Sequence, residues 1–240
     1  VEVFSREDCF NALKLSLYYM GASFVQLALA LYFASILSFK IKGAGVFKGF
    51  LFFPYLVCGI AVGFIFKFFY TRDFVLDTVL QWCGFELDNL PYWLKDTNIN
   101  NISLAATSVW RYMGQNMVLF IGAIMSVDSS LYEAAAIDGA GRWAKIKYVT
   151  LPGIKPTIII LLLMNVGNVL NAGFEIQYLL GNGLVQKVSQ TIDIYVLKWG
   201  ISQGDYAIGT AAGIFKSLVS IILIVIANQI AKRNGEEQLF

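Results

Sequence analysis

The sequence predicts an all-α protein, a polytopic bundle of transmembrane helices. Of its 240 residues, 58% are hydrophobic and 14% are charged, whereas roughly a quarter of the residues in a soluble domain are charged. The apolar residues gather in five blocks, and each has about the 20 residues that a helix needs to cross a bilayer. These blocks are Leu15–Phe39, Gly49–Tyr70, Ser103–Ser126, Ile154–Phe174 and Tyr206–Ala231.

The basic residues between the blocks indicate how the chain is oriented. When the polar insert at residues 127–155 is placed in the cytoplasm, nine basic residues lie inside and five lie outside, as the positive-inside rule requires. This orientation predicts a cytoplasmic carboxyl end, an outer amino end and a sixth helix before Val1. The inner residues are Lys40, Lys42, Lys48, Arg142, Lys145, Lys147, Lys155, Lys232 and Arg233, and the outer ones are Arg6, Arg72, Lys95, Lys187 and Lys198.

Composition excludes several classes of function. Histidine is absent, which removes the commonest general base and metal ligand. Cys9, Cys58 and Cys83 form no C-x-x-C pair, so neither a zinc site nor a redox dithiol is indicated. No G-x-x-x-x-G-K-[ST] motif is present, and the net charge of +2 is too small to indicate nucleic-acid binding. We expect a single transmembrane domain over residues 1–240 that binds no metal or cofactor and does not hydrolyse ATP itself.

The insert at residues 127–155 carries helix signals of its own. Ser130 and Glu133 have the spacing of a capping box, which starts a helix. The alanines at 134–136 continue it with high helix propensity, and Gly139 is the left-handed residue expected at its end. The pattern predicts a helix of about two turns with a flat alanine face that another surface approaches closely.

A second short helix is predicted from Arg142 to Tyr148, carrying Arg142, Lys145 and Lys147. We expect Leu151-Pro152 to break it and Pro156 to open the next apolar block. An alternative is an ordinary solvated loop between membrane helices. We favour the helical interpretation because such loops are usually short and turn-like.

These residues carry a resemblance to a known family. Glu133-Ala134-Ala135, Asp138-Gly139-Ala140 and Leu151-Pro152, followed by Lys155-Pro156-Thr157, resemble the EAA signature of the permease subunits of binding-protein-dependent ABC importers. In that family the signature forms the coupling helices that sit in a cleft of the cytoplasmic ATPase subunit. The resemblance implies ATPase coupling for one group of residues, named here the coupling set. Its members are Glu133, Ala134, Ala135, Asp138, Gly139, Ala140, Arg142, Leu151 and Pro152.

The resemblance extends over nearly the whole chain. Phe52-Phe53-Pro54-Tyr55, Ser108–Arg111 with Gly114–Asn116, and Phe174-Glu175 resemble the carbohydrate-uptake class of these permeases. Residues 170–196 are similar to permeases linked to oligosaccharide or polysaccharide uptake, a group that includes alginate-oligomer importers. The family implies a second homologous permease subunit, two cytoplasmic ATPase subunits that bind ATP and Mg, an extracytoplasmic solute-binding protein and a bacterial cytoplasmic membrane. It also implies alternating access driven by ATP.

Polar residues inside the apolar blocks predict a second functional region. A charge at membrane depth costs at least ~2.5 kcal/mol, so each must face protein or water. Arg111 shares a helix face with Gln115 in the third block. In the fourth block, Asn165, Asn168, Asn171 and Glu175 recur at i, i+3, i+6 and i+10, a single polar stripe.

We favour an aqueous path lined by these residues, with neighbouring aromatic rings to face a sugar. The path set is Trp110, Arg111, Gln115, Asn116, Asn168, Asn171, Phe174, Glu175 and Tyr178. Two structural alternatives stay open. Buried amides also hold helices together by interhelical hydrogen bonds of roughly 0.6 kcal/mol each, which we prefer for Gln26 and Asn165. Arg111 and Glu175 are nearly as well explained by a mutual ion pair.

The outer segments are predicted to hold small structures at the membrane interface. Trp82, Tyr92 and Trp93 are amphipathic rings of the kind found at headgroup level. Gly181-Asn182-Gly183 is a turn signal. Thr191–Trp199 is expected to form either a short interfacial helix or an inserted outer loop.

Three functions were weighed. A permease subunit of an ATP-driven oligosaccharide importer accounts for both the coupling set and the path set. A membrane-embedded enzyme using Glu175 or Asp193 as acid or base lacks a second carboxylate or a metal set at matching depth. A secondary transporter or channel for a small polar solute, independent of ATP, is the alternative.

Overall fold

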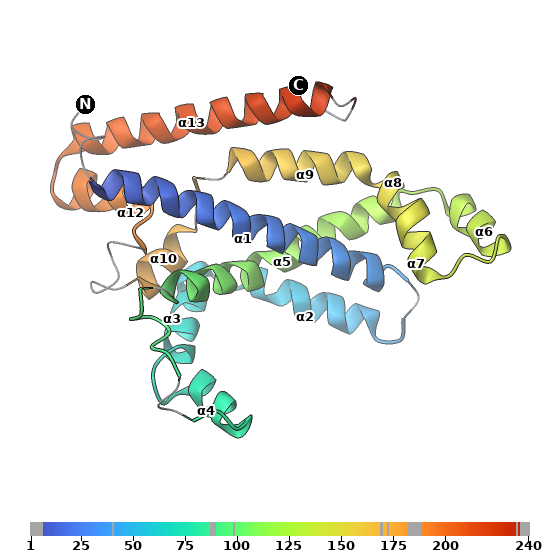
Figure 1. Cartoon of the computed structure of the whole chain (residues 1–240), viewed down its shortest axis with the longest axis horizontal. Coiled ribbons are helices and arrows are strands. Elements are labelled where there is room, and N and C mark those ends of the chain that lie inside the picture. Colours follow the sequence, from blue (N-terminus) through green and yellow to red (C-terminus); the bar gives the residue numbers. More distant parts are fainter. Residues whose placement is uncertain are drawn as a thin grey trace. The chain divides into compact units, whose positions relative to one another are not determined.

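The computed structural model describes residues 7–39, 41–86, 90–97, 99–168, 170–171, 173–181, 189–233 and 235. Within these residues the regular elements are helices, as the sequence predicted (Figure 1). The chain divides into two compact units. Unit 1 comprises Val1–Ala22, Val57–Val109 and Asn168–Ile221, and unit 2 comprises Ser23–Leu56, Trp110–Gly167 and Ile222–Phe240. The expected single transmembrane domain stays a prediction.

Three of the predicted apolar blocks form long continuous helices. They are α1 (Glu7–Leu37), α5 (Asn100–Met125) and α13 (Tyr206–Arg233). Within the described residues, two helices, Lys14–Leu37 of α1 and α13, are each long and apolar enough to cross a membrane. Counting each of three bent helix pairs as one span gives up to five spans, the number predicted from the sequence.

The second predicted block is not one straight helix. It forms α2 (Ala44–Leu56) and α3 (Gly59–Phe69), which are bent by 100° at the intervening break. Pro54 lies inside α2, two residues before its end, and its missing N–H weakens the last turn. Cys58 then takes an extended ψ of 136° before α3 begins. The prediction of an uninterrupted span over Gly49–Tyr70 was therefore wrong.

The fourth predicted block is shorter than expected. The helix α9 (Lys155–Gly167) ends before Asn168, and α10 (Phe174–Leu180) follows after a turn. In that turn the backbone N–H of Asn171 donates to the carbonyl oxygen of Asn168 over 2.8 Å, and Gly173 adopts a left-handed φ of 69°. Asparagine favours turns because its side chain bonds to nearby backbone groups, and glycine favours them because it adopts a positive φ without steric cost. The predicted continuous polar stripe from Asn165 to Glu175 on one helix was therefore wrong.

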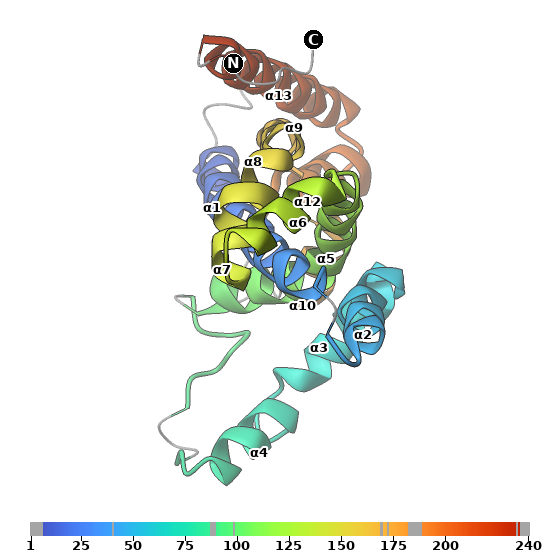
Figure 2. The same ribbon diagram turned by 90° about the vertical axis from the view of Figure 1, so that its right-hand side faces the viewer.

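Unit 2 has an apolar core and a helical loop. Residues of α1, α5 and α9 form the core, with Met117, Phe120 and Ile154 almost wholly buried. The helix α5 passes close to α2 at Gly114, where a Cβ atom would lie 2.1 Å from the carbonyl oxygen of Leu51. The loop after α5 contains α6 (Ser129–Ile137), α7 (Arg142–Lys145), the π-helical segment η2 (Ile146–Thr150) and α8 (Leu151–Gly153) (Figure 2).

Unit 1 joins α3 to α10 through small residues. A Cβ atom on Gly63 would lie 2.5 Å from the side chain of Leu179, so a larger residue there would force Leu179 to move. Parts of α1 and α5 complete this core. A second cluster packs Tyr195 of α12 (Ile192–Tyr195) against Ile208 and Ala212 of α13. Of the two alternatives for Thr191–Trp199, the helical one is confirmed, as α12 and the π-helical segment η3 (Val196–Ser202).

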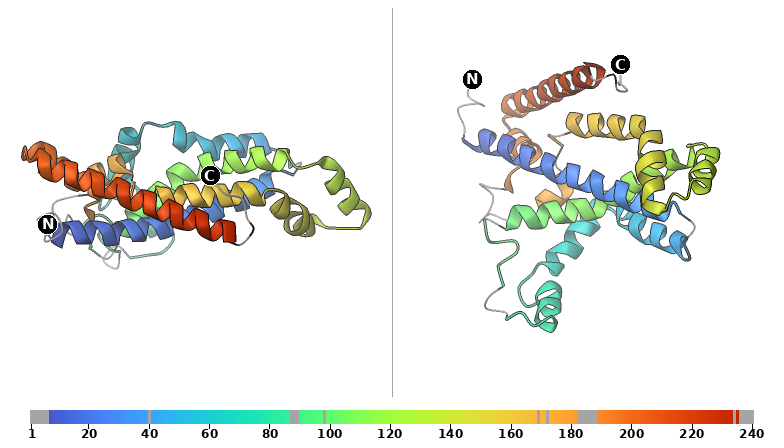
Figure 3. Two further views of the ribbon diagram at one scale, coloured as in Figure 1. Left: turned by 90° about the horizontal axis from the view of Figure 1, so that it is seen from above. Right: turned by 45° about the vertical axis from the view of Figure 1, so that its right-hand side comes forward.

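A small lobe follows α3 within unit 1 and contains α4 (Val75–Trp82) (Figure 3). Its centre is the fully buried carboxylate of Asp77. Trp93 Nε1 donates to Asp77 Oδ1 over 2.8 Å, and Arg72 lies 3.8 Å from Asp77 Oδ2. Trp82, by contrast, is one of the most exposed apolar side chains. The predicted location of these rings in the membrane interface stays a prediction, and the turn signal at Asn182-Gly183 lies outside the described residues.

Candidate functional site

The helix α6 begins differently from the prediction. Its N-cap is Asp128, and Asp128 Oδ1 accepts a hydrogen bond from the backbone N–H of Ser130 over 2.9 Å. Hydrogen bonds from Ser130 lower the pKa of the exposed Asp128 carboxyl, because they stabilise its charged form. The predicted capping box of Ser130 and Glu133 was wrong, since an aspartate at the N-cap satisfies the same orphan N–H groups. Glu133 is exposed on the helix surface.

The end of α6 agrees with the prediction. Gly139 has a φ of 74°. The N–H of Ala140 donates to the oxygen of Ala135 over 2.8 Å, and that of Gly139 donates to Ala136 over 3.1 Å. This pair of bonds is a Schellman motif, which needs a left-handed residue at the glycine position. Gly139 is therefore confirmed as the terminator of α6.

No residue of α6 is buried. Leu131 is 52% exposed and Ile137 is 88% exposed, and with Ala134 they recur at i, i+3 and i+6. Such spacing places all three on one side of a helix. The predicted alanine face is therefore the middle of an uncharged apolar stripe. Ile137 was missed by the sequence analysis, although its spacing from Leu131 was visible there.

The second helix of the loop continues past the predicted break. After α7, the chain runs through η2 and α8 without leaving helical geometry until Ile154, whose φ and ψ are −103° and 8°. Pro152 lies inside this helical run, as the second residue of α8, and it contributes no N–H there. The predicted break at Leu151-Pro152 was therefore wrong. The chain turns by 66° at Ile154 instead, where α9 begins.

The remaining coupling-set residues lie on the loop as expected. Arg142 and Pro152 are exposed, and Leu151 is half-buried. Trp143, which the sequence analysis did not single out, stacks on Tyr32 of α1 with ring centroids 6.5 Å apart and planes 28° apart. This contact ties α7 to the core helices of unit 2.

The path-set residues of unit 2 follow one another along α5. They are Trp110, which is exposed, and Arg111, Gln115 and Asn116, which are intermediate in burial. Arg111 donates from Nη1 to the Tyr112 hydroxyl over 3.0 Å, and its guanidinium lies 4.9 Å from the centre of the same ring. The neighbouring Tyr112 therefore orients Arg111, a role that the sequence analysis missed.

The path-set residues of unit 1 form two small groups. Phe174 and Tyr178 stack on each other, with ring centroids 5.6 Å apart and planes 18° apart, and both rings are exposed. Asn171 Nδ2 donates to Asn168 Oδ1 over 3.1 Å in the turn before α10. Glu175 lies in the first turn of α10, between the two aromatic residues in sequence.

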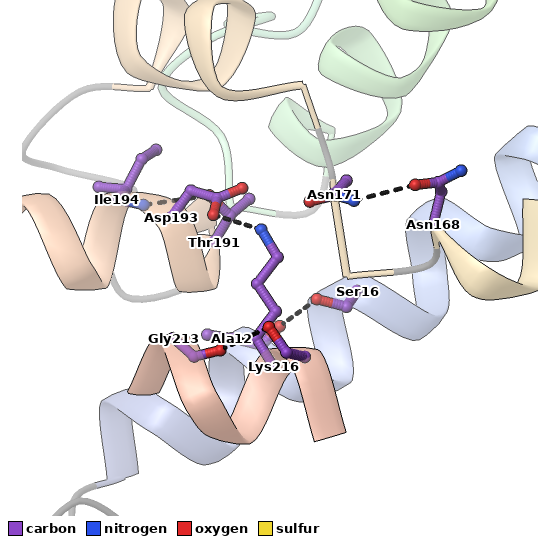
Figure 4. A network of polar contacts seen from close by, with 10 residues as sticks. Ala12, Ser16, Asn168, Asn171, Thr191, Asp193, Ile194, Gly213 and Lys216 are labelled. Carbon is purple, nitrogen blue, oxygen red and sulfur yellow. Dashed lines mark hydrogen bonds and ion pairs between the residues drawn. The ribbon is translucent and has the colours of Figure 1, made fainter. Parts of the chain in front are cut away.

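Lys216 is paired within unit 1. Its Nζ lies 2.5 Å from Asp193 Oδ1, so α13 and α12 are joined by an ion pair (Figure 4). Asp193 follows Thr191, whose Oγ1 accepts from the N–H of Ile194 as the N-cap of α12. The sequence did not indicate this pair, because 23 positions separate the two residues along the chain.

The path set is divided between the two units, so one continuous path through all nine residues stays a prediction. The ion pair between Arg111 and Glu175 stays an alternative for the same reason. Asn165 Nδ2 donates to Leu161 of its own helix over 3.0 Å, a bond that is intrahelical. Among the described residues, no group of three or more Asp, Glu, Cys or His side chains is placed to hold a metal ion.

Residues 26–235 match the protein family described as binding-protein-dependent transport system inner membrane components. The chain belongs to this family. It is also similar to Protein LplB of Bacillus subtilis (strain 168), with 45% identity over 147 residues. That alignment covers 61% of this chain and 46% of the relative.

Other relatives and solved structures agree with this membership. The polygalacturonan/rhamnogalacturonan transport system permease YteP of the same organism is 42% identical over 132 residues, which cover 55% of this chain and 41% of the relative. The chain thus spans less than half the length of these curated relatives.

The fold resembles that of two crystal structures. One is a bacterial ABC transporter involved in the import of the acidic polysaccharide alginate, with 27% identity, a TM-score of 0.89 and coverage of 97% of this chain and 82% of that one. The other is a bacterial alginate ABC transporter in complex with an alginate pentasaccharide-bound periplasmic protein, with 26% identity, a TM-score of 0.91 and coverage of 99% and 83%. The all-α permease fold predicted from the sequence is confirmed.

Proposed function

We propose that this chain is a permease subunit of an ATP-driven importer that moves oligosaccharides into the cytoplasm. The observation that carries the proposal is α6, a short helix with no buried residue and an uncharged stripe from Leu131 to Ile137. Such an exposed apolar surface indicates a docking site for another protein. It lies within the signature that resembles the coupling helices of the family.

The partners follow from this role. The apolar stripe of α6 docks on one of two cytoplasmic ATPase subunits, which bind ATP and Mg. A second, homologous permease subunit completes the membrane part, and a solute-binding protein delivers the substrate on the outer side. Support comes from the family to which the chain belongs and from the resemblance to a transporter solved with a periplasmic protein. The insert and the carboxyl end are cytoplasmic in this arrangement, consistent with the distribution of basic residues.

The path set supplies the chemistry that sugars need. The stacked rings of Phe174 and Tyr178 offer an aromatic face to the apolar side of a sugar ring. The amides of Asn168 and Asn171 both donate and accept hydrogen bonds, so they suit hydroxyl groups. Relatives that transport polygalacturonan or import alginate support an acidic oligosaccharide as the substrate class.

The test is uptake by the complete complex in proteoliposomes. The chain is purified with its partner permease, its ATPase and its binding protein, and entry of a labelled uronate oligomer is measured with and without ATP. A matched complex carries an ATPase with its phosphate-binding lysine replaced. We expect uptake to disappear in the matched complex. Uptake that continues there would instead indicate a secondary transporter or a channel.

A further inference from the structure

The structure ties the exposed helix α6 to the adjoining π-helical segment through one pair of hydroxyl groups. Tyr132, on α6, has its hydroxyl 3.0 Å from Thr150 Oγ1. Tyr132 is half-buried although its helix contributes no buried residue, and Thr150 is 1% exposed. The bond therefore joins the exposed helix to a buried position.

Thr150 has a second neighbour at the start of the π-helical segment. Its hydroxyl donates to the carbonyl oxygen of Lys145 over 3.4 Å, since a carbonyl oxygen accepts only. In the bond with Tyr132 either hydroxyl can donate. Lys145 and Thr150 are five residues apart, which is the spacing of one π turn. Tyr132 thus bonds to the residue that closes the wide turn of η2.

The segment beyond Thr150 leads directly to a membrane helix. The helix α8 follows at Leu151, and α9 begins after the 66° turn at Ile154. At this base the chain is closely packed, because a Cβ atom on Gly153 would lie 2.9 Å from Val127. A π turn inside a helix is a frequent feature of functional sites, since its looser hydrogen bonding accommodates a change of register.

We infer that Tyr132 is a positioning residue for coupling: its bond to Thr150 passes a displacement of α6 into η2 and from there into α9. The inference rests on the proposed function. This bond needs a hydroxyl group on each residue, so removing either hydroxyl breaks it.

The experiment measures the coupling ratio, the number of substrate molecules imported per ATP hydrolysed, in proteoliposomes containing the complete complex. The variants are Tyr132→Phe, Thr150→Val and their double substitution. Thr150→Ser keeps the hydroxyl, and Tyr148→Phe removes a hydroxyl from an exposed ring on the same segment, so both serve as matched controls. Assembly with the ATPase is measured for each by co-purification.

We expect each hydroxyl-deleting variant to lower the coupling ratio by about fivefold, the factor expected for one net hydrogen bond, with assembly and basal ATP hydrolysis unchanged. The double variant should be no worse than either single variant, because both remove the same bond. The two controls should match the wild type.

Two results would overturn the inference. One is a wild-type ratio in Thr150→Val. The other is loss of assembly in the hydroxyl-deleting variants while Thr150→Ser assembles, which would assign the bond to folding. Failure of the proposed function itself is distinguishable, because the wild-type complex would then show no ATP-dependent uptake.

Discussion

Replacing Gly139 by Val tests whether the ordered end of α6 is needed for transport. The glycine has a φ of 74° and nothing lies within 4 Å of the position of a Cβ atom there, so the cost of a substitution is in the backbone alone. A left-handed conformation costs a residue with a Cβ atom roughly 1–2 kcal/mol, and a β-branched residue lies at the upper end of this range.

This cost is large relative to the stability of α6. The helix has nine residues and none is buried, whereas isolated helices shorter than about 12–15 residues are marginal. A loss of about 1–2 kcal/mol changes the ratio of ordered to frayed helix by roughly 5- to 30-fold. The membrane helices are unaffected, because Gly139 packs against no other residue.

The assay compares Gly139→Val with Gly139→Asn in the reconstituted complex. Asparagine tolerates the left-handed region, so it is the matched control for adding a side chain. We expect ATP-dependent uptake to be abolished by valine and largely kept by asparagine, with equal amounts of both variants in the membrane. Equal uptake by the two variants would refute the reasoning.

Three further predictions test other parts of the account. Gly114→Ala would place a Cβ atom 2.1 Å from a backbone oxygen of α2. We therefore expect thermal unfolding to show that the complex loses about 1–3 kcal/mol or more of stability. Gly122→Ala is the control and should cause no such loss, because the position of its Cβ atom is open space. Asn171→Ala and Glu175→Ala should change uptake kinetics or sugar preference with normal ATPase assembly, and unchanged uptake across several sugars would return both residues to a structural role. The pKa of Asp128 is lowered in the folded state. The stability that Asp128 gives to α6 is therefore complete above the ordinary carboxyl pKa, and it is lost as the pH falls through the lowered value. Hydrogen exchange at the backbone amides of α6 should show this loss of stability at low pH in the wild type. The same loss at low pH in Asp128→Asn would contradict the role of the Asp128 carboxylate as the N-cap.

The long elements could be predicted because their signals are local and repeated. Continuous apolar residues fix α1 and α13, and a glycine after a run of alanines fixes the end of α6. Each of these features depends on residues close together in the sequence. Hydrophobic length and a single required backbone conformation therefore decide these parts of the structure.

The breaks and pairings could not be predicted in the same way. The end of α9 depends on a competition between an apolar run, which favours a helix, and asparagines that bond to each other in a turn. Hydrophobicity alone does not decide that competition. The bonds of Tyr132 with Thr150 and of Lys216 with Asp193 join positions 18 and 23 residues apart, and only the folded chain brings them together.

The location of α6 relative to the membrane tests the central claim most directly. Ile137 is replaced by Cys in a chain whose Cys9, Cys58 and Cys83 are changed to Ser. Labelling by a membrane-impermeant maleimide and cross-linking to the ATPase are then measured in vesicles of both orientations. We predict labelling from the cytoplasmic face only, cross-linking to the ATPase, and protection from the label when the ATPase is bound. Labelling from the outer face, or a complex that assembles and transports with α6 deleted, would contradict the account.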